Sequence, residues 1–271
     1  MSNPPPQKWR GVGLTDIGRV RKLNQDAFSL DNVRQLWVLA DGMGGHAGGE
    51  IASQIAVDTI PQEFQRQIAV EPSPSPPTTT VETLLVQAIE TANQRIREQA
   101  SQNIKIKGMG TTIVAVTITQ THDTSQAVIA HCGDSRAYVL KNRSLDLWTK
   151  DHTLMEERLA LNLITPEQVR THPLRHVLTK GLGIEPQALP TVRTYLLEPT
   201  DLLLLCSDGL TKMLSDPEIQ TLVLKEAPNL DRIKNTLVAA ANRLGGEDNT
   251  TVVVIGSDSD ATLVDLPAAT E

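Results

Sequence analysis

Residues 110–141, GTTIVAVTITQTHDTSQAVIAHCGDSRAYVLK, decide the fold class of this chain. The runs GTTIVAVTI (110–118), QAVIAH (126–131) and RAYVLK (136–141) are rich in β-branched residues, which predicts three strands in a row. A doubly wound parallel sheet needs strands that alternate one-to-one with helices, and these strands do not. The stretch therefore predicts an α+β protein.

The segments on either side supply further strands and four long helices. Helical spacing of apolar residues predicts helices at 50–68, 81–102, 216–226 and 229–244, with short helices within 152–180. The other predicted strands are GVGLTD (11–16), DAFSL (26–30), QLWVLAD (35–41), TVRTYLL (191–197), DLLLLCSD (201–208) and TTVVVIG (250–256). Two antiparallel sheets packed face to face, with helix pairs on the outside, would use every element. We predict this αββα four-layer sandwich.

The predicted domain covers residues 9–256. Residues 1–8 are polar and proline-rich, and residues 257–271 lack a clear period, so we expect both ends to be flexible tails. The stretch EPSPSPPTTT at 71–80 predicts an exposed connector between two helices.

Composition excludes several classes of function. The formal net charge of −7 argues against binding to nucleic acid, which requires clustered positive charge. No apolar run approaches the roughly 20 residues that span a bilayer, so no membrane association is expected. The N-terminus lacks the apolar stretch of a secretory signal. We expect a cytoplasmic monomer.

Both cysteines fall in apolar runs that suit buried thiols. Cys132 lies in AVIAHCGD and Cys206 in LLLLCSDG, and neither belongs to a CxxC motif. A structural role is favoured over a thiol nucleophile, because free cysteine is among the most buried residue types.

Aspartates mark the ends of four strong apolar runs. They are Asp41, Asp134, Asp208 and Asp248, and Asp26 leads into a further strand. A single Asp-Gly pair is a common turn, but a sandwich whose strand ends converge would bring all these carboxylates together. Their repulsion is relieved by divalent cations, and a site rich in Asp suits Mg²⁺ or Mn²⁺.

The glycine-rich run GMGGHAGG (42–49) follows the first of these aspartates. Glycine lets the backbone turn sharply and approach a ligand closely, and the helix that follows favours anions at its N-terminus. The Lys and Ser/Thr that end a P-loop are missing. A centre of several aspartates beside such a backbone suggests metal-assisted hydrolysis of a phosphoester.

Six motifs occur in order along the chain: RKLNQD, ADGMGGHAGGE, MGTT, GDSR, SDGL and DNTTVVV. In this order and spacing the chain resembles the metal-dependent protein serine/threonine phosphatases of type 2C, above all the compact bacterial and cyanobacterial members. The resemblance implies phosphorylated proteins as substrates. It also implies two core Mn²⁺ or Mg²⁺ ions between the sheets and a weaker third ion.

The resemblance assigns roles to individual residues. Asp41 would bridge the two core ions, the carbonyl of Gly42 would bind one of them, and Asp208 and Asp248 would complete the shell of the first. Asp134 would help to hold the third ion.

Two further positions take part in the implied reaction. Asp26 would bond metal-bound water, and Arg21 would grip the substrate phosphate, for which the guanidinium fork is well suited. A water bridging the two ions would attack phosphorus directly, without a phosphoenzyme.

The sequence departs from eukaryotic members at two positions. Met43 stands where they carry a histidine directly after Asp-Gly, and Gln25 stands where they carry a glutamate. The nearest histidine, His46, would either protonate the leaving oxygen or cap the following helix, and the two alternatives are equally supported.

Residues 141–180 are expected to form the flap that borders the site in bacterial relatives. This segment has seven basic and five acidic residues and three of the six histidines: His152, His172 and His176. Its positive bias would attract phosphorylated substrates, or it is an ordinary solvated surface.

Three functions remain open on these arguments. An active phosphoprotein phosphatase is the leading hypothesis, since the aspartate set is complete. The alternatives are a catalytically silent phosphopeptide-binding regulator and a small-molecule phosphoester hydrolase.

Overall fold

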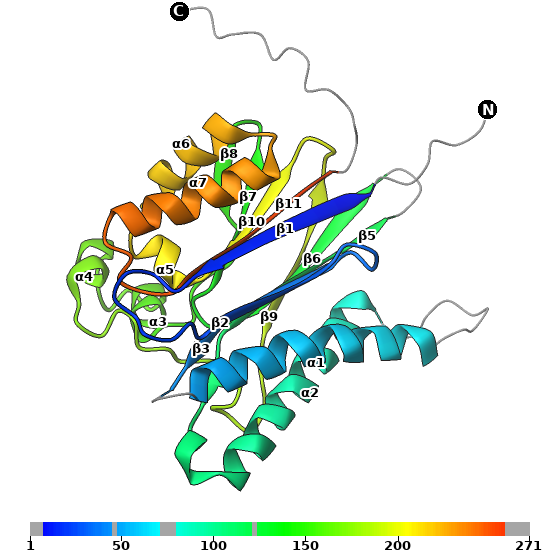
Figure 1. Ribbon diagram of the computed structural model, residues 1–271, viewed down its shortest axis with the longest axis vertical. Coiled ribbons are helices and arrows are strands. Elements are labelled where there is room, and N and C mark those ends of the chain that lie inside the picture. The colour runs from blue at the N-terminus through cyan, green and yellow to red at the C-terminus, as the bar shows by residue number, and fades with distance from the viewer. Residues whose placement is uncertain (1–7, 45–47, 71–79, 121–123, 258–271) are drawn as a thin grey trace, which may run out of the picture.

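The structure is a computed structural model that describes residues 8–44, 48–70, 80–120 and 124–257. In these residues the chain forms two antiparallel sheets that pack face to face, with helices on both outer faces (Figure 1). The predicted α+β class and the αββα order of layers are confirmed. The predicted tails and connector lie almost entirely outside the described residues.

The first sheet has five strands in the order β1-β11-β10-β7-β8. Every neighbouring pair in it is antiparallel. The strands are β1 (Trp9–Asp16), β11 (Thr250–Ser257), β10 (Leu202–Cys206), β7 (Arg136–Lys141) and β8 (Ser144–Leu147).

The second sheet has six strands in the order β2-β3-β5-β6-β9, with the short β4 paired to β3. Its neighbouring strands are also antiparallel. The strands are β2 (Asp26–Asp31), β3 (Leu36–Met43), β4 (Gly110–Thr111), β5 (Ile113–Gln120), β6 (Ser125–Cys132) and β9 (Thr191–Leu197).

Helices cover the outer face of each sheet. The long pair α1 (Gly48–Val70) and α2 (Val81–Gln102) lies on the six-stranded sheet, and α5 (Asp208–Thr211), α6 (Asp216–Glu226) and α7 (Leu230–Arg243) lie on the five-stranded sheet (Figure 1). The 3₁₀ helix η1 (Ile104–Ile106) follows α2. The short helices α3 (Leu154–Ala160) and α4 (Pro166–Thr171) come between β8 and β9 in the sequence.

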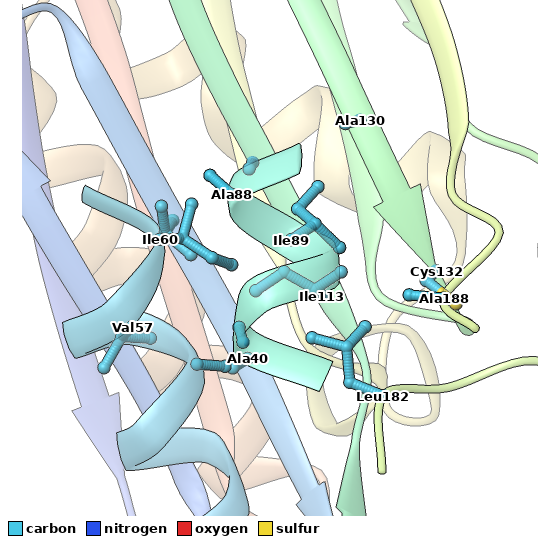
Figure 2. Close-up of a cluster of buried hydrophobic side chains, with 14 of the residues drawn as sticks. Ala40, Val57, Ile60, Ala88, Ile89, Ile113, Ala130, Cys132, Leu182 and Ala188 are labelled. Carbon is cyan, nitrogen blue, oxygen red and sulfur yellow. The ribbon is translucent and has the colours of Figure 1, made fainter. Parts of the chain in front are cut away.

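Side-chain alternation along the strands divides the core into three layers. On β3, Val38 and Ala40 pack toward the long helices, whereas Trp37 and Leu39 pack between the sheets. This is the two-residue period of a strand buried on both faces. Figure 2 shows the outer cluster, where side chains of both long helices meet those of β3 and β5.

Local sequence explains where the helices begin. The Thr80 hydroxyl accepts from the Thr83 N–H and caps α2 at its predicted start. Ser215 and Glu218 form a capping box at the start of α6. α1 begins two residues before the prediction and runs two residues past it, through Pro61.

Two sequence-based boundaries differ from the structure. The predicted strand 110–118 is broken at Thr112 into β4 and β5, because the Thr112 side chain and N–H bond to Asp41. The expected flap also starts later, since residues 141–147 belong to the β7–β8 hairpin of the five-stranded sheet. The segment outside the sheets therefore runs from Trp148 to Pro190.

Both cysteines are buried free thiols, as predicted. Cys132 belongs to the cluster under α1 and α2, and Cys206 to the cluster under α6 and α7. Burial raises the pKa of each thiol to about 12, so neither has the character of a nucleophile. In the part of the chain that the structure describes, no helix has the length and apolar character to span a membrane.

Candidate metal centre

A cleft of about 420 Å³ lies where the two sheets bring their strand ends together. Asp41 follows the buried run of β3, Asp134 lies between β6 and β7, Asp208 follows β10, and Asp248 precedes β11. All four carboxylates line the cleft, as do Gly42 and Arg21. The structure thus brings together the residues that the sequence proposed as ligands.

Asp26 and Asp41 form a carboxylate pair at the base of this cleft, in which Asp26 is buried and Asp41 is partly buried. They are direct cross-strand partners in the β2–β3 register. Asp26 Oδ2 accepts hydrogen bonds from the hydroxyls of Ser207 and Thr251, both at 2.7 Å. Thr251 lies on β11 of the five-stranded sheet and Ser207 directly follows β10, so Asp26 joins the two sheets at the base of the cleft.

Proximity and burial disfavour the charged forms of these carboxylates. Burial, together with the charge of the nearby Asp208 carboxylate, raises the pKa of Asp26 to about 6 and that of Asp134 to about 7. The pKa of Asp41 lies well above its ordinary value, first through burial and then through the negative charges of Asp26 and Asp208. This part of the site holds more negative charge than the protein neutralises.

The MGTT motif holds Asp41 in place. The Thr112 N–H donates to the Asp41 carbonyl at 2.8 Å, and the Asp41 N–H donates to Thr112 Oγ1 at 3.1 Å. Thr111 Oγ1 also donates to that carbonyl, at 2.9 Å. The Thr112 hydroxyl lies 2.7 Å from that of Ser135, next to Asp134. MGTT therefore connects two of the proposed ligand positions.

Two glycines allow close backbone approach at the site. A Cβ on Gly42 would collide with the carbonyl of Gly49 and with that of Gln25, to which the Gly42 N–H donates at 3.0 Å. A Cβ on Gly209 would collide with the Asn249 carbonyl. The Asp-Gly pairs thus serve backbone packing around the cleft, in addition to any approach to a ligand.

Asp208 and Asp248 converge on a cation that the sequence analysis did not identify. Lys212 Nζ lies 2.5 Å from Asp208 Oδ2 and 2.8 Å from Asp248 Oδ2. Arg21 contacts the same oxygen of Asp248 at 2.8 Å. The pKa of Asp248 is lowered by its Lys212 hydrogen bond and charge, against the effect of burial. The available signal was helical spacing, since Lys212 follows Asp208 by four residues.

Asn249 fixes the loop that carries Arg21. Its Oδ1 accepts from the Gln25 N–H at 2.8 Å, and its Nδ2 donates to the carbonyls of Ile17 and Leu23 at 3.0 and 2.9 Å. Arg21 lies between Ile17 and Leu23 in the sequence, so both flanks of its loop are fixed by Asn249. Its side chain is half exposed at the mouth of the cleft. The asparagine of the DNTTVVV motif therefore serves the placement of Arg21.

The candidate general acid is the one predicted residue that cannot be placed. His46 lies outside the described residues. Met43 and Gln25, the two departures from the eukaryotic pattern, both line the cleft. His176 lines it too, and it offers a ring nitrogen within 4.8 Å of oxygens of Asp134 and Asp208.

The residues present fit hard divalent cations. Among the described residues, Asp26 Oδ1 is a buried oxygen with no hydrogen-bond partner. Oxygens of Asp208 and Asp248 already surround the ammonium of Lys212. Asp134, His176 and Asp208 form a second group that could hold an ion. A donor set dominated by carboxylates favours Mg²⁺ or Mn²⁺.

Comparison with known proteins identifies the family. Residues 18–244 match the family model described as "Protein phosphatase 2C". The chain belongs to the protein phosphatase 2C family. The matched range includes Arg21, Asp41, Asp134 and Asp208, and Asp248 follows just beyond it.

Relatives within the 2C family cover nearly the whole chain. The serine/threonine phosphatase stp of Listeria welshimeri is 36% identical over 244 residues, which is 89% of this chain and 93% of that protein. The crystal structure of the Mycobacterium tuberculosis phosphatase PstP/Ppp superposes with a TM-score of 0.78 at 32% identity. It covers 92% of this chain and 98% of its own.

One further 2C structure contains metal. It is the catalytic domain of the phosphatase PstP in complex with two manganese ions, with a TM-score of 0.76 and 31% identity. It covers 93% of this chain and 99% of its own. Dependence of the family on divalent metal agrees with the carboxylate cluster described above.

Proposed function

We propose that this protein hydrolyses phosphoserine and phosphothreonine in other proteins, with Mn²⁺ or Mg²⁺ as cofactor. The observation that carries the proposal is the convergence of four carboxylates and Arg21 on one cleft. The 2C-family relatives named as serine/threonine phosphatases support the same conclusion.

We assign the ligands as follows. Asp41, the Gly42 carbonyl, Asp208 and Asp248 hold the two core ions, and Asp134 holds a weaker third. The raised pKa of Asp41 supports this, because a carboxylate surrounded by others gains most from a bound cation. His176 is a further candidate ligand beside Asp134.

When bound, the ions would supply activation of the attacking water and part of the charge stabilisation on the phosphoryl group. Arg21 binds the phosphate from the mouth of the cleft, where bidentate hydrogen bonds hold two of its oxygens. Asp26 uses Oδ2 to fix itself between the sheets, and we assign Oδ1 to orienting the attacking water. Attack is direct, without a phosphoenzyme.

Protonation of the leaving serine or threonine oxygen is assigned to His46. The assignment rests on its place in the sequence, three residues after Met43. Capping of α1 is the alternative role, and the pH dependence of turnover in His46→Ala separates the two.

We further propose that the enzyme acts as a cytoplasmic monomer on phosphorylated proteins, with no nucleic-acid partner. The two buried free thiols and the net charge of −7 support this placement.

The test uses the purified full chain with three classes of substrate. Turnover of p-nitrophenyl phosphate with Mn²⁺, abolished by EDTA, is expected of an active enzyme, and its absence would favour a silent phosphopeptide-binding regulator. Phosphoserine and phosphothreonine peptides should give a higher kcat/KM than phosphorylated metabolites. The reverse order would indicate a small-molecule phosphoester hydrolase.

A further inference from the structure

The loop that presents Asp134 is short and connects β6 to β7. It consists of residues 133–135, the first three of the GDSR motif, whose last residue begins β7. The Asp134 carboxylate is buried and lines the cleft, and its own backbone N–H donates a hydrogen bond to it. Its direction is therefore set by what holds this loop, which is the Ser135 hydroxyl contact with Thr112 and the contacts at the two ends.

His152 holds the first end. The Gly133 N–H donates to His152 Nδ1 at 3.1 Å, and the His152 N–H donates to the Gly133 carbonyl at 3.0 Å. The other ring nitrogen, Nε2, lies 2.9 Å from the hydroxyl of Thr191 on β9. Gly133 has φ of +114°, and a Cβ there would collide with Thr112, so the loop backbone has little freedom.

These contacts specify the state of the imidazole. Since Nδ1 accepts a hydrogen bond from a backbone N–H, the proton must reside on Nε2, which donates to Thr191. The ring stacks on His131 with centroids 4.5 Å apart and planes within 5°. Burial, then the neighbouring His131, lowers the pKa of His152 to about 3, so the ring is neutral at physiological pH.

Asp151 holds the other end of the same loop. Its carboxylate accepts from Arg136 Nε at 2.9 Å and from Arg136 Nη2 at 2.8 Å, a bidentate pair. Arg136 is the last residue of the GDSR motif and the first of β7. Two consecutive residues thus bind the two ends of the loop, with Asp134 between them.

The same two residues lie at the base of the flap. The Thr179 N–H donates to the His152 carbonyl at 2.9 Å, where the chain returns from α4. The Leu154 N–H donates to the Val177 carbonyl at 2.9 Å, one residue after His176. The base of the flap and the Asp134 loop are therefore held by one set of contacts.

We propose that Asp151 and His152 form a latch that positions Asp134, with His152 acting through the Gly133 N–H. They are positioning residues for the reaction and touch neither substrate nor ion. The inference rests on the proposed function, in which Asp134 holds the weaker ion. Neither residue was assigned a role from the sequence.

Two substitutions separate the contacts of His152. Asn places its carbonyl oxygen close to the position of Nδ1 and retains an acceptor for the Gly133 N–H. Gln reaches toward the position of Nε2, so it retains a donor to Thr191 but loses that acceptor. His152→Gln should lower kcat by about 10-fold or more, the usual effect of losing a group that orients a metal ligand. His152→Asn should stay within about 3-fold of the parent, and KM for p-nitrophenyl phosphate should change little in both.

Hydrogen exchange at the Gly133 amide measures the contact itself. Exchange should be at least about 10-fold faster in His152→Gln than in the parent and near the parent rate in His152→Asn. Equal protection in Gln and parent, or an Asn variant as defective as Gln, would overturn the proposal. Asp151→Asn keeps the imidazole and weakens the bidentate pair with Arg136 at the other end of the loop, and it should also speed this exchange. It provides the test if His152→Gln does not fold.

Asp134→Ala distinguishes failure of the proposed function from failure of the latch. Full kcat in Asp134→Ala would remove the proposed role of Asp134 and with it the catalytic consequence of the latch. Parent-like kcat in His152→Gln, beside an inactive Asp134→Ala, would contradict the latch and leave the proposed function standing.

Discussion

Asp41 and Asp248 line the same cleft, but the protein treats their charges differently. Asp248 meets Lys212 and Arg21 at 2.8 Å each, and its pKa is lowered. Asp41 is surrounded by other carboxylates, and its pKa is raised well above the ordinary value. One side of the centre is neutralised by the protein itself, whereas the other requires protons or bound cations. The binding of divalent ions should therefore contribute most on the Asp41 side.

The largest effect is expected from removing a ligand. Asp41→Asn and Asp208→Ala should each lower kcat about 10³-fold, because nucleophile activation and charge stabilisation are lost together. Steady-state kinetics at saturating Mn²⁺ give the measurement, with the exposed Asp231→Asn on α7 as the control. Near-normal turnover in both ligand variants would mean that the centre has been misassigned.

A smaller loss is expected at the mouth of the cleft. Arg21→Ala should lower kcat/KM roughly 10- to 100-fold, since it removes a charge-assisted phosphate contact from a half-exposed position. Calorimetric titration should still show two tightly bound Mn²⁺ ions. Lys22→Ala in the same loop is the matched control, and loss of a core ion in Arg21→Ala would contradict the division of roles.

A substitution at Lys212 tests the Asp248 side of the centre through the free energy of unfolding. Lys212→Met should lower the free energy of unfolding in EDTA by about 1–3 kcal/mol, because Asp208 and Asp248 lose the cation between them. In saturating Mn²⁺ the loss of stability should be smaller, because the bound ions then compensate the negative charges of Asp208 and Asp248. Chemical denaturation provides both values, with Lys225→Met on α6 as control. An equal loss of stability with and without Mn²⁺ would show that Lys212 and the bound ions do not compensate the same carboxylate charges.

The pH dependence of stability tests the carboxylates with raised pKa values, to which Asp134 belongs together with Asp41. A carboxylate whose folded-state pKa is raised destabilises the native state as pH rises from the unfolded value to the folded one. For Asp134 this window runs from 3.8 to about 7. In EDTA, Asp134→Asn should therefore gain stability over the parent progressively across this range and keep the gain above it. A constant difference from pH 4 to pH 8 would show that Asp134 ionises normally.

The sequence predicted the layers because their signal is local. The β-branched runs of β5, β6 and β7, and the helical spacing from Leu84 to Ile96 in α2, are readable without knowledge of distant contacts. The hairpin strand β8, SLDL, alternates polar and apolar residues, but it is only four residues long and largely exposed. It was therefore assigned to the flap rather than to the sheet.

The proposed ligands were predictable because they lie at strand ends within recognisable motifs. Lys212 and His152 were not, because their roles arise from distant residues: Asp248 lies 36 positions from Lys212, and Gly133 lies 19 positions from His152. Only the packing of the sheets brings these pairs together. Thr112 likewise looks like one more β-branched strand residue until its contact with Asp41 is seen.

The central claim is that the two sides of the centre carry opposite electrostatics, and one measurement tests it most directly. The free energy of unfolding at pH 7 in EDTA is compared among the parent, Asp41→Asn and Asp248→Asn. Asp41→Asn should be more stable than the parent, because a neutral amide removes repulsion among buried carboxylates. Asp248→Asn should be less stable, because Lys212 and Arg21 lose their partner. Changes of the same sign in the two variants would contradict the account.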